Sequence, residues 1–256
     1  TPAVSGSAIS AAFGDLDGDG SPDLVVALED RIQIFINDGA GKFRESAGAA
    51  GEAGSIFTGL LGGVSLADVD NDGDLDIFVA GFLSAPSSAP AGAPPRFPLD
   101  WPGASSRLYI NATPQREEGT TAEAAPPDAS PAIVLTETAA KALVDHAGRR
   151  TSGAVFSDLD NDRDIDFALA SPGDGTTIFS NLRDGTFKEM GAASGLPANA
   201  LVFGLAVGDY NKDGWMDLVA TTWDGGLPRL FRNMMGDPAA GPGGRGGAFA
   251  LDATAL

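Results

Sequence analysis

The sequence contains no cysteine in its 256 residues. Disulfide bonds, thiolate metal sites and cysteine nucleophiles are therefore excluded. It also lacks any run of about 18 apolar residues, so no segment is predicted to span a membrane. The first residues, TPAVSGSAIS, lack the charged start and apolar stretch of a signal peptide.

Basic residues are scarce: 16 Lys and Arg stand against 35 Asp and Glu, which gives a formal net charge of −19. Nucleic acid and anionic membranes are disfavoured as partners, because both require a basic surface. Many of the acids are concentrated in a few short segments rather than spread along the chain.

Four acidic segments repeat along the chain. They read DLDGDGSPDLVVA, DVDNDGDLDIFVA, DLDNDRDIDFALA and DYNKDGWMDLVAT, and their starts are 53, 90 and 51 residues apart. A short alternating stretch precedes each segment and an apolar, partly β-branched stretch follows it, which predicts two short strands per repeat. Farther along, each repeat has an apolar–aromatic–x–Asn tetrad that ends at Asn37, Asn111, Asn181 or Asn233.

The tetrad predicts a third strand, and a fourth is predicted from Phe43, Leu135, Phe187 and, with a weaker pattern, Phe249. Four short strands in about 50 residues are typical of a propeller blade. We therefore expect an all-β fold, a β-propeller of four-stranded antiparallel blades, in a single domain over residues 1–256. Residues 137–147 are the one stretch that suggests a turn or two of helix.

Two Pro/Ala-rich loop insertions are predicted in the second repeat, at residues 82–106 and 112–131, and a Gly/Pro insertion in the fourth, at residues 236–247. Inside the first, Arg96, Phe97 and Trp101 are candidates for partner binding, because these residue types are common at interaction hot spots. The alternative is that the aromatic side chains pack onto their own blade.

The acidic loops, at residues 15–23, 68–76, 158–166 and 209–217, have the ligands that calcium prefers. Calcium takes six to eight hard oxygen ligands in tolerant geometry. Carboxylates at loop positions 1, 3, 5 and 9 and the backbone carbonyl of position 7 supply them, and glycine at position 6 permits the sharp turn. Without a cation, the carboxylates of one loop would repel one another. The predicted ligands of up to four calcium ions are Asp15, Asp17, Asp19, Ser21 and Asp23; Asp68, Asp70, Asp72, Asp74 and Asp76; Asp158, Asp160, Asp162, Asp164 and Asp166; and Asp209, Asn211, Asp213, Trp215 and Asp217.

Two loops depart from this pattern. The third has Arg163 at position 6, where a side chain disfavours the turn and adds a positive charge. The fourth has Asn211 at position 3 and Lys212 beside it. We therefore expect the first two sites to bind calcium more tightly than the last two.

Other calcium loops fit less well. An EF-hand needs a Glu at position 12 and flanking helices, whereas position 12 here is apolar in every loop. Thrombospondin type 3 loops would bring cysteines. Magnesium is disfavoured because it keeps its water ligands.

The segments DVDNDGDLDIFVA, RLYIN and TIFSNLRDGTFKEMGAASGL closely resemble FG-GAP/VCBS repeats, in the variety found with ASPIC/UnbV domains and in cartilage acidic protein. Integrin α-subunit propellers carry the same calcium loop. The resemblance implies a β-propeller with structural calcium on one rim and partners docked on a face. Such propellers often have seven blades, so four repeats leave two readings: a segment of a longer protein, or a partial ring completed by another subunit.

A binding role is favoured over catalysis. His146 is the sole histidine and is read as a surface or packing residue, and no G-x-S-x-G, H-E-x-x-H or Walker-type motif occurs. We expect a non-enzymatic module for adhesion or scaffolding that binds a protein partner. The alternative is a lectin-like propeller or a non-catalytic module of a polysaccharide-active enzyme. Modest calcium affinity would place the protein outside the cell, in the periplasm or on the cell surface.

Overall fold

The computed structural model describes residues 4, 6–46, 57, 59–84, 97–114, 133–190, 195–223, 225–237 and 248–253. Sixteen strands lie in these residues. The described part of the chain contains no helix long and apolar enough to cross a membrane.

The strands form four separate four-stranded antiparallel sheets, one for each repeat. We call each sheet a blade and number the blades one to four. Blade one contains β1 (Ala8–Gly14), β2 (Asp23–Leu28), β3 (Ile32–Asn37) and β4 (Phe43–Glu45). Blade two contains β5 (Leu60–Ala67), β6 (Asp76–Leu83), β7 (Arg107–Asn111) and β8 (Leu135–Glu137). Blade three contains β9 (Gly153–Ser157), β10 (Asp166–Ser171), β11 (Gly175–Asn181) and β12 (Phe187–Glu189). Blade four contains β13 (Val202–Gly208), β14 (Asp217–Thr222), β15 (Arg229–Asn233) and β16 (Phe249–Leu251).

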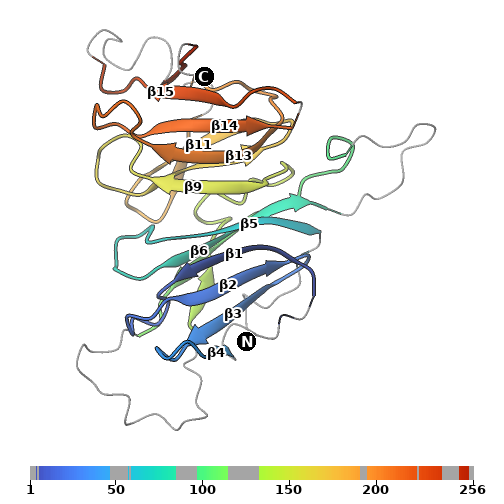
Figure 1. The fold of residues 1–256 in the computed structure, drawn as a ribbon, viewed down its shortest axis with the longest axis vertical. Helices are drawn as coiled ribbons and strands as arrows, with labels where there is room; N and C mark the ends of the chain where they lie inside the picture. Colours follow the sequence, from blue (N-terminus) through green and yellow to red (C-terminus); the bar gives the residue numbers. More distant parts are fainter. Residues whose placement is uncertain are drawn as a thin grey trace, which may run out of the picture.

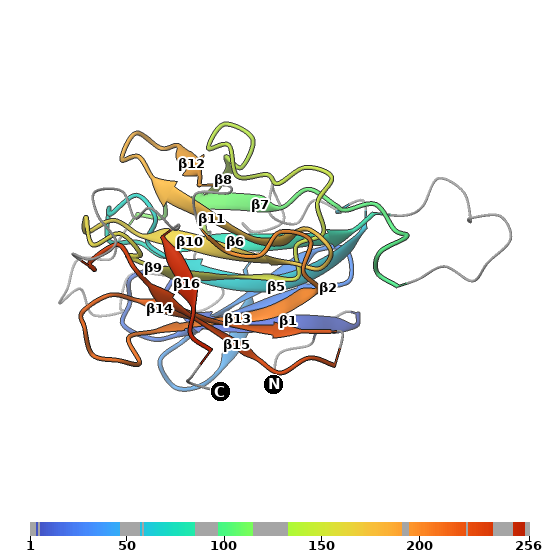
Figure 2. The same ribbon diagram turned by 90° about the horizontal axis from the view of Figure 1, so that it is seen from above.

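The blades stack in chain order, with blade one and blade four at opposite ends (Figure 1). Contacts between successive blades run through their first strands, β1 with β5, β5 with β9 and β9 with β13. In the view along the stack, β5, β9 and β13 overlap near the middle, whereas the outer strands β8 and β12 lie at one edge (Figure 2). The described blades therefore form an open array, and the sheets do not close into a ring.

Both faces of an inner blade are apolar, because each is covered by another blade. All eight residues of β6 are buried. Since successive side chains of a strand point to opposite faces, Ile77 joins the core between blades one and two. Phe78 joins the core between blades two and three. We call the contact between two successive blades a seam. The core of the third seam, between blades three and four, contains residues such as Ile178 and Phe231. This explains why the second strand of each repeat reads as a continuous apolar run rather than an alternating one.

The strand pattern expected from the sequence is confirmed, including the three-residue fourth strands and the weak case at Phe249. Two details differ. The insertion expected to begin at residue 82 begins later, because Phe82 and Leu83 continue β6 and are buried. Most of the residues expected in the three insertions, Arg96 among them, lie outside the described part.

The helix suggested for residues 137–147 is wrong. Residues 139–143 form hydrogen-bonded turns, and the backbone enters the left-handed region at Leu143 (φ 65°) and His146 (φ 49°). Ala139, Ala142 and Val144 face the core between blades two and three. Contact with this core selects the irregular path over a helix.

Candidate metal site in the acidic loops

Each acidic loop connects the first two strands of a blade and turns through two left-handed residues. At position 6 these residues have φ between 79° and 98°; they are Gly20, Gly73, Arg163 and Gly214. Arg163 thus adopts the turn that its glycine counterparts adopt without strain. Position 4, which was not predicted, is also left-handed in every loop: Gly18, Asn71, Asn161 and Lys212. The residue types at position 4 of the first three loops could have indicated this conformation, because glycine and asparagine enter the left-handed region most readily.

The carboxylate at position 1 wraps the loop around itself. In the second loop, Asp68 accepts the N–H groups of Asp72 at 3.2 Å and Gly73 at 3.0 Å. The carboxylate of Asp72, at position 5, accepts the N–H of Asp74 at 2.9 Å. The other three loops repeat both contacts. Hydrogen bonds within each loop therefore set the directions of these carboxylates.

Three of the four loops gather three carboxylates. Within each group, one oxygen from each member lies within 4.8 Å of the others; the groups are Asp15, Asp17 and Asp19; Asp68, Asp70 and Asp76; and Asp158, Asp160 and Asp166. In the fourth loop, where Asn211 stands at position 3, no such group occurs among the described residues. The assignment of the full ligand sets, including the position 7 carbonyls of Ser21 and Trp215, stays a prediction.

The aspartate at position 9 has a structural role that its ligand assignment did not include. Asp76 is buried and accepts two backbone N–H groups, from Val69 in its own loop and from Asn111 on β7, both at 2.8 Å. Asp23, Asp166 and Asp217 make the equivalent pair of contacts. This carboxylate therefore ties the loop to the third strand of its blade.

Burial disfavours the charged form of these position 9 carboxylates. It raises the pKa of Asp76 to about 7, although the hydrogen bonds from Asn111 and Val69 oppose the rise. It raises the pKa of Asp23 and of Asp166 to about 6 in the same way. A nearby cation would favour the ionised form of each group.

The residues fit a hard divalent cation. The donors in each group of three are carboxylate oxygens, which suit calcium. In the third loop, Oδ1 of Asp160 is buried and has no hydrogen-bond partner. A buried polar atom without a partner is costly, and a bound ion would satisfy it. If an ion binds, Asp158, Asp160 and Asp166 are the residues placed to hold it there.

The tetrad asparagine, which the sequence marked only as a strand end, links neighbouring blades. Asn111 donates through Nδ2 to the carbonyl of Leu16 in the first loop at 2.9 Å and to that of Leu75 in its own loop at 3.2 Å. Asn181 and Asn233 repeat this pair of bonds at the next two seams. One side chain per seam thus holds two acidic loops together.

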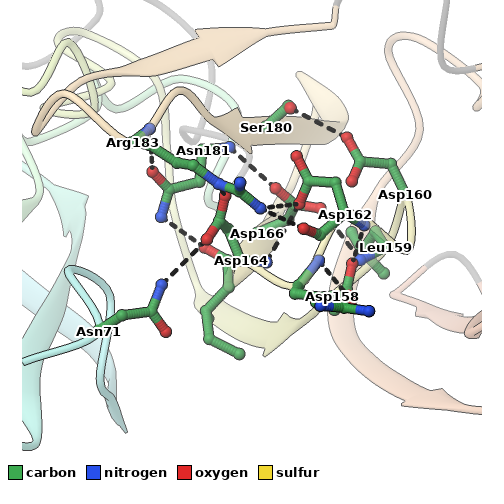
Figure 3. A network of polar contacts seen from close by, with 12 residues as sticks. Asn71, Asp158, Leu159, Asp160, Asp162, Asp164, Asp166, Ser180, Asn181 and Arg183 are labelled. Carbon is green, nitrogen blue, oxygen red and sulfur yellow. Dashed lines mark hydrogen bonds and ion pairs between the residues drawn. The ribbon is translucent and has the colours of Figure 1, made fainter. Parts of the chain in front are cut away.

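An arginine from β11's end reaches the third loop (Figure 3). Arg183 donates to the carboxylate of Asp164 and to the backbone carbonyl of Asp162. Asp164 also accepts Nδ2 of Asn71, from the second loop, at 3.0 Å. The positively charged side chain that contacts the carboxylates of the third loop is therefore Arg183. Arg163, which the sequence suggested, forms no ion pair with the loop in the described part of the chain.

An arginine also reaches the fourth loop, where the carboxylate that it contacts is more exposed than Asp164. Arg232, at the third tetrad position, donates to Asp213 at 3.1 Å. Among the described residues, no lysine or arginine forms an ion pair with a carboxylate of the second loop. The third and fourth loops thus carry an internal positive charge that the second loop lacks.

A cavity of about 460 Å³ lies between blades two and three, beside the second and third loops. Its volume is within the range of small-ligand sites. Apolar side chains such as Leu108, Ile110 and Phe187 line it together with polar ones such as Thr136 and Lys141. Sequence reasoning could not find this cavity, because its walls come from two blades.

The aromatic residues of the first insertion lie on blade two. The ring of Phe97 contacts Phe82 at 6.0 Å and Trp101 at 5.8 Å between centroids, although half of Phe97 remains exposed. Arg150 donates to the carbonyls of Leu99 and Trp101 and anchors this segment. These contacts favour the alternative that the aromatics pack onto their own blade.

His146 is a buried group rather than a surface one. Its Nδ1 lies 2.8 Å from the hydroxyl of Thr151, and its Nε2 accepts a hydrogen bond from Arg149 at 2.9 Å. Burial, together with the charge of Arg149, lowers the pKa of His146 to about 3. The imidazole is therefore neutral and occupied on both nitrogens.

Repeated four-stranded antiparallel sheets with acidic loops on successive seams define a propeller-type repeat protein. The model of the FG-GAP-like repeat matches residues 3–79 and 158–220, more than half of the chain. The chain therefore belongs to the FG-GAP-like repeat family, whose repeats form β-propellers, as the resemblance predicted. No curated protein matches the chain.

Two solved structures are similar over most of this chain. One is a lectin of Agrocybe aegerita, in a structure on recognition of non-reducing terminal N-acetylglucosamine: 14% identity, 94% of this chain, 50% of the lectin chain and a TM-score of 0.44. The other is the Photorhabdus luminescens Tc holotoxin pore, at 14% identity, 96% of this chain, 12% of that chain and a TM-score of 0.27. The chain thus spans only half the length of the lectin chain and about an eighth of the toxin chain.

Proposed function

We propose that this chain is a calcium-stabilised extracellular binding module that serves adhesion or scaffolding by docking a protein partner. The observation that carries the calcium part is the repetition of carboxylate groups at equivalent places in three blades. Each group lies on a loop that also forms the seam to a neighbouring blade through the tetrad asparagine. An ion held there would stabilise the loops that join the blades.

The proposal treats the chain as non-enzymatic. The buried, neutral His146 has both ring nitrogens engaged, which supports a structural role for it over that of a general base. The position 9 carboxylates are held by backbone N–H groups of their own blades, which supports the same view.

The cavity between blades two and three is the proposed docking place. It combines apolar walls with a few polar groups, as ligand sites do. Thr136 and Lys141 are exposed and line it from blade two and the turn that follows. A side chain of a protein partner or a single sugar ring would both fit this volume, so the two ligand classes are separated by experiment.

Calcium titration of metal-stripped protein by calorimetry tests the calcium part. We expect at least two ions per chain with dissociation constants of about 10⁻⁴–10⁻³ M, the range of extracellular modules. Replacing Asp70 by Asn should remove one of them. Heat changes no larger than dilution would contradict the proposal, and sub-micromolar constants would contradict the extracellular setting.

The binding part is tested by comparing a glycan array with affinity capture from the native source. Thr136→Arg would fill the cavity, and Ala250→Arg, at an exposed position on β16, is the matched control. We expect a captured protein that the control retains and Thr136→Arg loses. A glycan hit with the same dependence would replace the protein partner with a sugar, and binding unaffected by Thr136→Arg would exclude the cavity.

A further inference from the structure

In the third loop, the side chain at position 7 contacts the preceding blade. Asp164, at position 7 of the third loop, is 3% exposed and meets Asn71 of the second loop at 3.0 Å. Arg183, which belongs to blade three like Asp164, forms an ion pair with this carboxylate. In the seam between blades two and three, the buried carboxylate at position 7 therefore has a hydrogen-bond donor and a positively charged partner.

Asp74 occupies the same position in the second loop and is 7% exposed. Neither of the partners that Asp164 has exists in its seam. Position 4 of the first loop is Gly18, which has no side chain to donate, and the residue equivalent to Arg183 is Thr113. The Thr113 hydroxyl donates to Oδ1 of Asn111 and accepts a hydrogen bond from the N–H of Val134. Oδ1 of Asp74 is accordingly buried without a hydrogen-bond partner.

The backbone next to Asp74 lies against the first loop. The residue after it, Leu75, shares one donor with Leu16 of the first loop, because Nδ2 of Asn111 bonds both carbonyls. Leu75 also packs on the residue before Asp15: a Cβ added at Gly14 would meet Leu75 Cδ1 at 2.6 Å.

We propose that Asp74 is a ligand of the divalent cation held by the first loop, supplied across the seam from blade two. Its buried, unpartnered oxygen would join the carboxylate group of Asp15, Asp17 and Asp19. The ion at the first loop would then clamp two blades together, and it would do in that seam what Arg183 and Asn71 do in the next. This inference rests on the proposed calcium binding and adds a ligand that lies outside the first loop.

The test follows calcium binding loop by loop, using the amide signals of Gly20 and Gly73 in nuclear magnetic resonance titrations. These amides sit at position 6 of the first and second loops. In Asp74→Asn, we expect the dissociation constant reported by Gly20 to rise about tenfold or more, because ligand charge sets affinity. The constant reported by Gly73 should change by no more than about twofold, because position 7 is assigned to the second site through its backbone carbonyl and no ligand charge is lost there. Asp164→Asn, the same substitution at the same loop position with its partners inside the chain, should leave the Gly20 constant unchanged.

A second measurement guards against a general loss of structure. In chelator, Asp74→Asn should melt no lower than the unsubstituted chain, because it removes an unpartnered buried charge. Adding calcium should raise the melting temperature of Asp74→Asn by less than it raises that of the unsubstituted chain. A shift at Gly73 alone, or unchanged constants at both glycines, would overturn the inference. Absence of saturable shifts in the unsubstituted chain would instead contradict the proposed calcium binding itself.

Discussion

The seam between blades one and two and the seam between blades two and three share one device and differ in another. Both are joined by a tetrad asparagine that bonds two loop carbonyls, Asn111 in the first seam and Asn181 in the second. They differ at the buried position 7 carboxylate: Asp164 has an arginine and an amide, whereas Asp74 has an oxygen without a partner. Backbone-directed contacts are thus common to the repeats, and charge compensation is particular to each seam.

The largest effect is expected from the shared device. Asn111→Ala should lower the free energy of unfolding by about 2–4 kcal/mol, because two buried carbonyls lose their donor. Asn181→Ala should cost a similar amount. In the first blade, Nδ2 of Asn37 donates to the carbonyl of Pro22 in its own loop, and Asn37 is more exposed than Asn111, so Asn37→Ala should lower the free energy of unfolding by about 1 kcal/mol or less. Urea unfolding measures all three, and an equal loss for Asn37 and Asn111 would show that the bond across the seam adds nothing.

Acidity should act on both seams alike when calcium is absent. The folded-state pKa values of about 7 for Asp76 and about 6 for Asp23 and Asp166 lie above the ordinary 3.8. The folded state therefore binds more protons, and stability falls as pH rises from about 4 through 7. We expect the melting temperature of metal-free protein to drop by several degrees between pH 5 and 7.5. A rise over that interval would contradict the burial of these carboxylates.

Removing the internal cation should make the two seams more alike. In Arg183→Gln, Asp164 loses its charged partner, so metal-free protein should melt lower. Calcium should bind the third loop about tenfold more tightly, because a competing positive charge has gone. Arg163→Gln is the matched control: it removes one charge from the same loop but breaks no ion pair. Equal responses from the two variants would mean that general charge, rather than the contact with Asp164, sets the difference.

The smallest effect concerns backbone strain in the third loop. Arg163 has φ of 79°, where a side chain costs about 1 kcal/mol relative to glycine. Arg163→Gly should therefore raise the free energy of unfolding by up to about 1 kcal/mol in calorimetric unfolding. A destabilised variant would show that the arginine side chain contributes contacts worth more than the strain.

The features that repeat within one blade could be predicted from the sequence. The strands, the tetrads and the position 6 turn depend on local patterns of two to nine residues, and Arg163 adopts the expected left-handed conformation. The features that join blades could not be predicted. Asn71 lies 93 residues from Asp164, and Asn111 lies 95 residues from Leu16; only the stacking of blades brings these groups together.

The expectation that the first two sites bind calcium more tightly stays a prediction, but its physical basis changes. The sequence suggested Arg163 and Lys212 as the interfering cations. The ion pairs of the structure instead involve Arg183 and Arg232, which come from the third strands and their ends. Charge placed by tertiary structure, rather than charge adjacent in sequence, distinguishes the loops.

Thermal unfolding in about 2 mM calcium and again in chelator tests the central claim, that calcium holds the blade seams. With a dissociation constant near 0.1 mM, each occupied loop adds about 1.8 kcal/mol by mass action. Two occupied loops should therefore raise the melting temperature of a chain of this size by about 10 °C. A melting temperature that is the same in calcium and in chelator would contradict the claim.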